Sequence, residues 1–275
     1  MVSQQGINTG VAIIFTANPD YMKIILRPLQ ILYCLYALLT FVLIMLLVLP
    51  FVVAASFFGE IKGGNVIYKI CGIWGKIWYP LVGMTYKNIY DVPHDPTGKY
   101  IFVANHISYM DIPPVVMNID QPVRVLGKYE MVHYPIFGYI YKCAVILVDR
   151  RDSEKRAQSV RHLKEVLAKH ISILIFPEGT FNTTGQPLRE FYDGAFRIAI
   201  ETQTPIKPLL FIDTIDRLHY SSIFTLSPGP NRVVYLQEIP VEGLTIKDVA
   251  QLKQIVYNNM DTALRKYRHY PQDKS

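Results

Sequence analysis

The segment YIFVANHISYMDIPP, residues 100–114, passes from a short apolar run through a polar turn to two prolines. The run Tyr100–Ala104 is rich in aromatic and apolar residues, which is typical of a buried strand. Because Pro113 and Pro114 in succession fit only the first turn of a helix, we expect a helix to begin near Asp111. The sequence therefore predicts a strand, a tight polar turn and a helix, which is the repeating unit of α/β sheets.

The chain after about residue 87 repeats this alternation of short apolar runs and amphipathic segments. Several runs are continuous and β-branched, which predicts strands that are covered on both faces. The further strands expected are Val123–Leu126, Ala144–Val148, Ile171–Phe176, Ile206–Ile212 and Val233–Ile239. The helices expected are Ser153–Ala168, Gly194–Glu201 and Thr245–Tyr267. We therefore expect an α/β fold with a largely parallel, mixed sheet that is flanked by helices.

A long uncharged stretch precedes this region, since no charged residue occurs from Pro28 to Gly59. Its core, Ile31–Phe58, would make a helix about 42 Å long, against a bilayer hydrocarbon core of about 30 Å. The segment is therefore too long for one upright span, and Pro50 is expected to kink or end a helix. Two arrangements stay open: a single span over Ile31–Leu49, or a membrane-embedded helical hairpin that turns at Pro50. The run is too long for the apolar core of a signal peptide.

The segment after this stretch combines basic and aromatic residues. Lys62, Lys69 and Lys76 are seven residues apart, so they form one stripe on a helix. One interpretation is a helix that lies in the membrane interface, with the lysines toward anionic headgroups and Trp74 and Trp78 at the boundary. The other is an amphipathic helix that packs on the following domain. We expect residues 1–62 to be the membrane-embedded segment and residues 63–275 to be one domain.

The composition excludes several classes of protein. The 275 residues carry 28 Lys and Arg against 22 Asp and Glu, and only 18% are charged, compared with about 25% in soluble proteins. Low charge and high apolar content exclude a disordered chain, and three cysteines exclude a disulfide scaffold. The basic residues are spread along the chain, so no nucleic-acid partner is expected. The seven histidines show no metal-ligand spacing, so no metal is expected.

The turn after the first strand contains the strongest candidate for catalysis. Ligands of open α/β sheets bind at the carboxyl ends of strands, where His106 lies. His106 and Asp111 are five residues apart, so the two side chains can meet only if His106 lies in the turn before the helix. An aspartate that holds one imidazole nitrogen leaves the other free to act as a general base.

Three further motifs follow expected strands or begin one. Phe176–Thr180 places Glu178 on a glycine-containing turn, and the residue pattern alone also fits a plain turn. Val148–Arg151 places two arginines at a strand end, which suits either a bidentate phosphate contact or a solvated helix start. Pro205–Pro208 begins a strand and says little by itself.

These motifs, in this order, resemble those of the glycerolipid acyltransferase family, specifically the 1-acylglycerol-3-phosphate acyltransferases. Asn105–Asp111 matches the NHxxxxD block, Val148–Arg150 the arginine block, Phe176–Thr180 the FPEGT block and Pro205–Pro208 the terminal proline block. Lys128–Glu130, followed by Pro135–Gly138, is similar to the segment that connects the first two blocks. The resemblance covers roughly residues 60 to 240, and the family also carries an N-terminal membrane-embedded two-helix motif.

The resemblance implies a fatty acyl transfer with no cofactor besides the donor itself, an acyl-CoA or acyl carrier protein thioester. His106, oriented by Asp111, would deprotonate the sn-2 hydroxyl of lysophosphatidic acid, which attacks the thioester directly and gives phosphatidic acid. Arg150 and Lys128 would hold the phosphate of the acceptor. The substrate-binding residues implied are Asn105, Lys128, Arg150, Glu178, Gly179, Thr180 and Lys207. Membrane lipids would surround the enzyme, and the cytosolic donors place its catalytic domain on the cytoplasmic face of the cell membrane.

The sequence departs from the family pattern at two places. Phe181 and Asn182 stand where Arg-Ser usually follows the FPEGT block, and Tyr192 and Asp193 stand where basic residues are common. Two expected phosphate partners are therefore absent, and Arg189 and Lys207 are the available substitutes. The alternative is an O-acyltransferase of a different lysolipid, such as a monoacylated amino-acid lipid.

Two other classes of function fit the sequence less well. A non-catalytic membrane-binding scaffold would not need the intact pair of His106 and Asp111. A thioesterase or lipase would need a nucleophile, but the chain has no Gly-x-Ser-x-Gly motif, and Ser108 lies in a different context.

Overall fold

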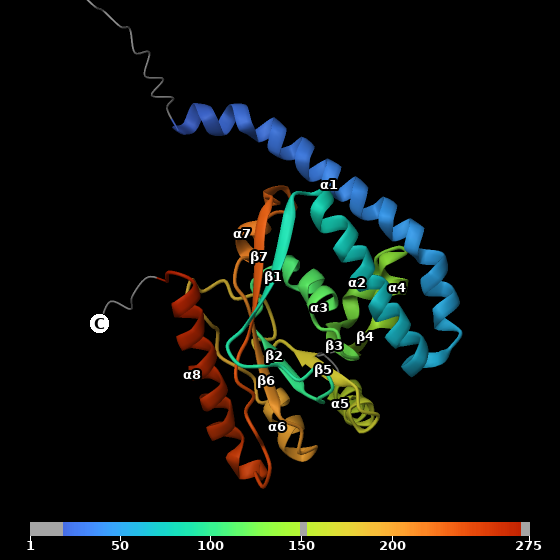
Figure 1. Ribbon diagram of the computed structural model, residues 1–275, viewed down its shortest axis with the longest axis vertical. Helices are drawn as coiled ribbons and strands as arrows, with labels where there is room; N and C mark the ends of the chain where they lie inside the picture. Colours follow the sequence, from blue (N-terminus) through green and yellow to red (C-terminus); the bar gives the residue numbers. More distant parts are fainter. Residues whose placement is uncertain (1–18, 149–152, 271–275) are drawn as a thin grey trace, which may run out of the picture.

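The protein forms a mixed seven-stranded sheet in the order β1-β7-β6-β2-β5-β3-β4 (Figure 1). The computed structural model describes residues 19–148 and 153–270. The strands are β1 Met84–Tyr90, β2 Ile101–Ala104, β3 Val123–Lys128, β4 Val145–Val148, β5 Ser172–Ile175, β6 Ile206–Phe211 and β7 Gly229–Tyr235. Strands β2 to β6 run parallel to one another, whereas β7 is antiparallel to β6 and parallel to β1. The predicted α/β fold with a largely parallel, mixed sheet is confirmed.

Helices cover both faces of the sheet (Figure 1). The helices after β2 are α3 Ile112–Asn118, α4 Phe137–Ala144, α5 Ser153–Ala168, α6 Gly194–Glu201, α7 Thr214–Arg217 and α8 Val249–Tyr267. Ile101 and Val103 of β2 share a hydrophobic cluster with α5, α6 and α8. Phe102 and Ala104 point to the opposite face, where their cluster includes α3. All four β2 side chains are 0% exposed, which explains why this strand is a continuous apolar run.

The strand that sequence analysis missed is β1, at one edge of the sheet. Its residues include Thr85, Lys87 and Asn88, and most of them are exposed or half-buried, so no apolar run marks the strand. The last expected strand, Val233–Ile239, is displaced, because β7 begins at Gly229 to pair with β1 and ends at Tyr235. An edge strand is fixed by its partner more than by its own composition.

The apolar N-terminal stretch forms one helix, α1, over Pro19–Ser56. The expected turn at Pro50 is wrong. Pro50 lies on the exposed side of α1, while Met45 and Val52 on either side of it are buried and hold the helix in place. The chain instead reverses over residues 57–63, which include the π-helical turn η1 (Gly59–Gly63), and returns alongside α1 as α2, Gly64–Leu81 (Figure 1). Leu26–Ser56 is long and apolar enough to span a membrane.

Helix α2 packs between α1 and α3, so the interpretation that it packs on the following domain is confirmed. The rings of Trp74 and Phe41 of α1 are 4.4 Å apart and tilted by 40°, and Trp78 Nε1 donates a hydrogen bond of 3.0 Å to the carbonyl of Ala37. Both tryptophans are at most 6% exposed, so their side chains pack inside the protein, and the interpretation that they lie at the level of a membrane boundary stays a prediction. The rings join the two helices. The division of the chain at residue 62 stays a prediction.

The exposed side of α2 keeps the basic stripe that the spacing predicts. Lys62, which precedes the helix in η1, Lys69 and Lys76 are all exposed. Ile73 and Ile77 lie beside the stripe and are 54% and 47% exposed. This side of α2 therefore combines cations and apolar side chains, which is the composition that suits an anionic membrane surface.

The contact between α2 and α3 leaves no room for a side chain at Gly72. A Cβ atom there would lie 2.5 Å from the carbonyl oxygen of Val116. We expect Gly72→Ala to lower the free energy of unfolding by about 1–3 kcal/mol, because backbone must move to relieve the clash. The matched control is Gly194→Ala in α6, where nothing lies within 4 Å, with an expected change within about 0.5 kcal/mol. Thermal unfolding in detergent measures both, and equal effects would contradict the packing.

Candidate active site

The pair of His106 and Asp111 lies just after β2, at the carboxyl edge of the sheet. Asp111 Oδ2 is 2.8 Å from His106 Nδ1, and it also accepts the backbone N–H groups of Ile107 at 2.8 Å and Ser108 at 3.0 Å. Asp111 is 0% exposed, whereas the His106 side chain is 17% exposed. His106 lies in the turn before the helix, which is the arrangement that the five-residue spacing requires. With Nδ1 on the aspartate, Nε2 is on the opposite side of the ring.

Ser108 stabilises this turn and is fully buried. Its hydroxyl accepts the N–H of Met110 at 3.0 Å and donates to the carbonyl of Leu218 at 2.5 Å. Together with Asp111, it forms a capping box at the short helical turn before α3. A serine that is buried and donates its proton to a carbonyl is not placed to act as a nucleophile.

The loop after β5 holds the backbone of His106 from the neighbouring strand. Glu178 Oε1 accepts the N–H of His106 at 2.8 Å, and Oε2 accepts the N–H of Arg189 at 2.8 Å. The N–H of Asn182 donates to the carbonyl of His106 at 2.7 Å. Burial raises the pKa of Glu178 to about 7, although the N–H groups of Arg189 and His106 oppose this rise. Glu178 therefore acts on the imidazole through the main chain.

Two aromatic rings contact the imidazole. The ring of Phe176 stacks on it with centroids 4.1 Å apart and an interplanar angle of 21°. The ring of Phe181 meets it at 4.4 Å and 63°. Tyr109 in turn meets Phe181 edge to face at 4.7 Å. Sequence analysis noted Phe181 only as a departure from a pattern, and no sequence signal indicated that Phe176 touches the histidine.

Asn105 has a structural role in this site, because its side chain is bonded to the protein backbone. It is 0% exposed, and its amide donates to the carbonyl of Phe211 at 3.0 Å and accepts the N–H of Phe211 at 2.8 Å. These side-chain bonds tie the residue after β2 to the backbone at the end of β6. Gly179 has a φ of +72°, which favours glycine, and Thr180 beside it is half-buried. Both therefore lie in the loop that holds His106.

Of the predicted cations, the two in the described part of the chain, Lys128 and Lys207, do not lie beside His106. Lys207 pairs with Phe102, well before the carboxyl end of β2, and it is buried with its ammonium 5.9 Å from the centre of the Tyr100 ring. Its pKa is lowered by burial. Lys128 is exposed at the end of β3, which lies two strands from β2, or about 10 Å across the sheet. Arg150 lies outside the described residues.

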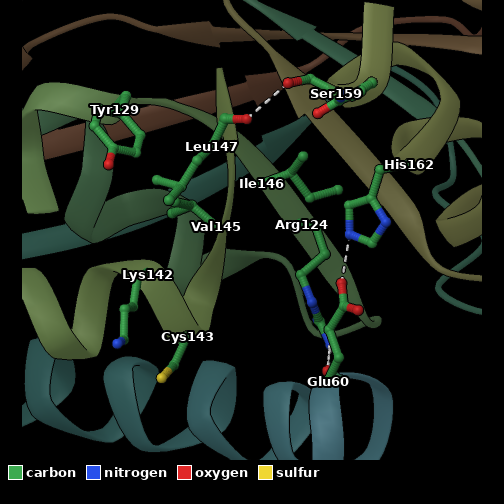
Figure 2. Close-up of a pocket in the computed structure, with 11 residues that line it drawn as sticks. Glu60, Arg124, Tyr129, Lys142, Cys143, Val145, Ile146, Leu147, Ser159 and His162 are labelled. Carbon is green, nitrogen blue, oxygen red and sulfur yellow. Dashed lines mark hydrogen bonds and ion pairs between the residues drawn. The ribbon is translucent and has the colours of Figure 1, made fainter. Parts of the chain in front are cut away.

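Of two cavities in the structure, the smaller lies beside His106. The larger, about 450 Å³, lies between η1, β4 and α5, where Glu60 contacts His162 at 2.5 Å (Figure 2). Among the residues that the structure describes, its lining includes none of the predicted site residues. The smaller, about 290 Å³, is lined by Ile107 and Asn182 beside His106. Within the two described ranges, no group of three or more His, Cys, Asp or Glu side chains is arranged to hold a metal ion.

The amino-acid sequence is similar to those of known proteins. Residues 84–212, which include the pair and its supporting loop, match the acyltransferase family model. A 1-acyl-sn-glycerol-3-phosphate acyltransferase of Cocos nucifera is 27% identical over 239 residues, which is 83% of this chain and 72% of that protein. A lyso-ornithine lipid O-acyltransferase of Pseudomonas aeruginosa is 29% identical over 174 residues, which is 58% of this chain and 66% of that protein.

The fold also has a counterpart among solved structures. A 1-acyl-sn-glycerophosphate acyltransferase of Thermotoga maritima superposes with a TM-score of 0.70 at 20% identity, and the match covers 90% of this chain and 100% of that one. The family match covers strands β1 to β6 and the histidine–aspartate turn, and the relatives named above are acyltransferases. The chain is therefore an acyltransferase: residues 84–212 match the acyltransferase family model, and the chain is similar to 1-acyl-sn-glycerol-3-phosphate acyltransferases.

Proposed function

We propose that this enzyme is membrane-associated and transfers a fatty acyl group from acyl-CoA or acyl carrier protein to the sn-2 hydroxyl of lysophosphatidic acid. The observation that carries the proposal is the 2.8 Å contact between His106 Nδ1 and the buried Asp111 Oδ2. It fixes the ring so that Nε2 is available to a hydroxyl group. The name of the Cocos nucifera relative supports the choice of acceptor.

The proposed reaction proceeds in one transfer without an acyl-enzyme. His106 Nε2 takes the proton of the acceptor hydroxyl while its oxygen attacks the carbonyl carbon of the thioester. The carbon–sulfur bond then breaks, the ester bond remains, and the proton passes from the imidazole to the departing sulfur. A base in this position accelerates transfer about 10²–10⁴-fold. Asp111 stabilises the imidazolium that forms between the two proton transfers.

The helical hairpin gives the enzyme access to a lipid acceptor. Leu26–Ser56 of α1 has the length and composition to span a membrane, and the lysines of α2 lie on an exposed side. Each lysine near an anionic leaflet contributes about 1 kcal/mol of binding. The cytosolic acyl donors place the catalytic domain on the cytoplasmic face of the cell membrane.

A second acceptor class is supported by the residues beside the site. Phe181 packs its ring on His106, Tyr192 is exposed, and Asp193 is engaged by Lys253 Nζ at 2.8 Å. None of these three side chains is a cation for a phosphate. The Pseudomonas aeruginosa relative, which is a lyso-ornithine lipid O-acyltransferase, supports a monoacylated amino-acid lipid as the alternative acceptor.

An acceptor screen with purified full-length protein decides between these two. Lysophosphatidic acid and lyso-ornithine lipid are offered with radiolabelled acyl-CoA or acyl carrier protein, with His106→Ala as the inactive control. We expect acylated lysophosphatidic acid from the wild type and a loss of about 10²–10⁴-fold in the variant, with membrane binding retained. Acylation of lyso-ornithine lipid alone would overturn the choice of acceptor. Transfer at the wild-type rate by His106→Ala would overturn the mechanism.

The buried carboxyl group of Glu178 makes stability depend on pH. Its pKa is about 7 in the folded chain against 4.5 in an exposed chain, so the folded state keeps a proton that the unfolded state has lost between these values. The free energy of unfolding therefore falls by up to about 3 kcal/mol as the pH rises from about 4.5 to 7. We expect the melting temperature of wild type, relative to Glu178→Gln, to fall over this range. A difference that does not change with pH would contradict the assignment.

A further inference from the structure

The imidazole of His106 lies in an aromatic enclosure made of Phe176, Phe181 and Tyr109. Phe176 stacks on one side at 4.1 Å, and Phe181 meets the ring at 4.4 Å and 63°. Tyr109 supports Phe181 at 4.7 Å with its ring nearly perpendicular, at 86°. The acyl-transfer reaction itself uses none of these rings. Their arrangement around the base therefore needs a separate explanation.

The three rings are buried to different extents. Phe176 is 9% exposed and belongs to the core between β2, β5 and α3, whereas Tyr109 is 54% exposed. Phe181 is half-buried and lies between Tyr109 and the imidazole. Phe181 is therefore the outer wall of the enclosure, and Tyr109 holds its edge from the solvent side.

The residue after Phe181, Asn182, is hydrogen-bonded to His106, the residue whose ring Phe181 contacts. The N–H of Asn182 donates to the carbonyl of His106 at 2.7 Å. The amide of Asn182 donates to the carbonyl of Gln186 at 2.8 Å and its oxygen accepts the N–H of Thr184 at 3.0 Å, which closes the loop on itself. Because these bonds fix the loop relative to His106, the ring of Phe181 has a defined position over the imidazole.

A base that activates an alcohol can also activate water. Attack by water on the same thioester would break the carbon–sulfur bond and release a free fatty acid and a thiol, with the proton passing through His106 in the same way. Transfer to the lipid therefore requires that water is kept from the base while the thioester is bound. An apolar ring beside the imidazole serves this purpose, because it offers water no hydrogen-bond partner.

We propose that Phe181, supported by Tyr109, is a positioning residue that sets the ratio of acyl transfer to thioester hydrolysis. It reduces the access of water to His106 while the thioester is bound. The proposal rests on the proposed acyl transfer, and it extends that function by assigning a role to a residue outside the proton-transfer pair. Removal of the ring opens the base to water, whereas a bulky aliphatic side chain keeps the wall apolar.

The experiment measures two rates with purified full-length enzyme and acyl-CoA. Thiol release without acceptor gives hydrolysis, and acylated lipid formed with the best acceptor from the screen gives transfer. We expect Phe181→Ala to raise the ratio of hydrolysis to transfer at least about fivefold, and Phe181→Leu to change it less than about twofold. Phe224→Ala is the matched control, since Phe224 is 45% exposed and has no ring contact with His106 among the described residues.

The outcomes separate this inference from the proposed function. If wild type forms acylated lipid but Phe181→Ala loses hydrolysis and transfer in equal proportion, the ring has only a structural role and the inference is overturned. An unchanged ratio in a folded Phe181→Ala enzyme overturns it as well. If wild type forms no acylated lipid with any acceptor, the proposed function fails instead. Tyr109→Ala supplies a second test in the event that Phe181→Ala does not fold, with an increased ratio expected and an unchanged one contradicting the proposal.

Discussion

A single buried oxygen atom, Asp111 Oδ2, organises the carboxyl edge of the sheet. It accepts hydrogen bonds from two successive backbone N–H groups, those of Ile107 and Ser108, and it lies 2.8 Å from His106 Nδ1. A buried carboxylate is costly unless such donors surround it. The same interaction therefore shapes the turn, begins the helical segment that leads into α3 and orients the imidazole. Local folding and the proposed catalysis depend on one group.

The parallel sheet extends this local arrangement to the neighbouring strand. Because β2 and β5 are adjacent and parallel, the loop after β5 ends beside the turn after β2. Glu178 and Asn182 use this proximity to bind the N–H and the carbonyl of His106. Asn105 fastens the other side of the turn to β6 through Phe211. Glu178, Asn182 and Asn105 thus act by holding His106 in place. His106 is the residue that would contact the substrate.

Sequence reasoning predicted the features that depend on local pattern. The apolar runs gave β2 to β6, and the spacing of His106 and Asp111 required the turn in which the two meet. It missed β1, whose strand conformation comes from pairing with β7, and it misplaced the chain reversal, because buried neighbours carry α1 through Pro50. One of the two interpretations of α2 placed Trp74 and Trp78 at a lipid boundary, whereas the structure shows that they contact α1, which composition alone does not reveal.

The most direct test of the account is the activity of Asp111→Asn. The amide is nearly the same size as the carboxylate but carries no charge, so it cannot stabilise the imidazolium that forms when His106 takes a proton. We expect kcat for acyl transfer to fall about 10²–10⁴-fold, with far-ultraviolet circular dichroism showing retained α/β structure. A folded Asp111→Asn enzyme with kcat within about threefold of wild type would contradict the claim that this carboxylate positions the base.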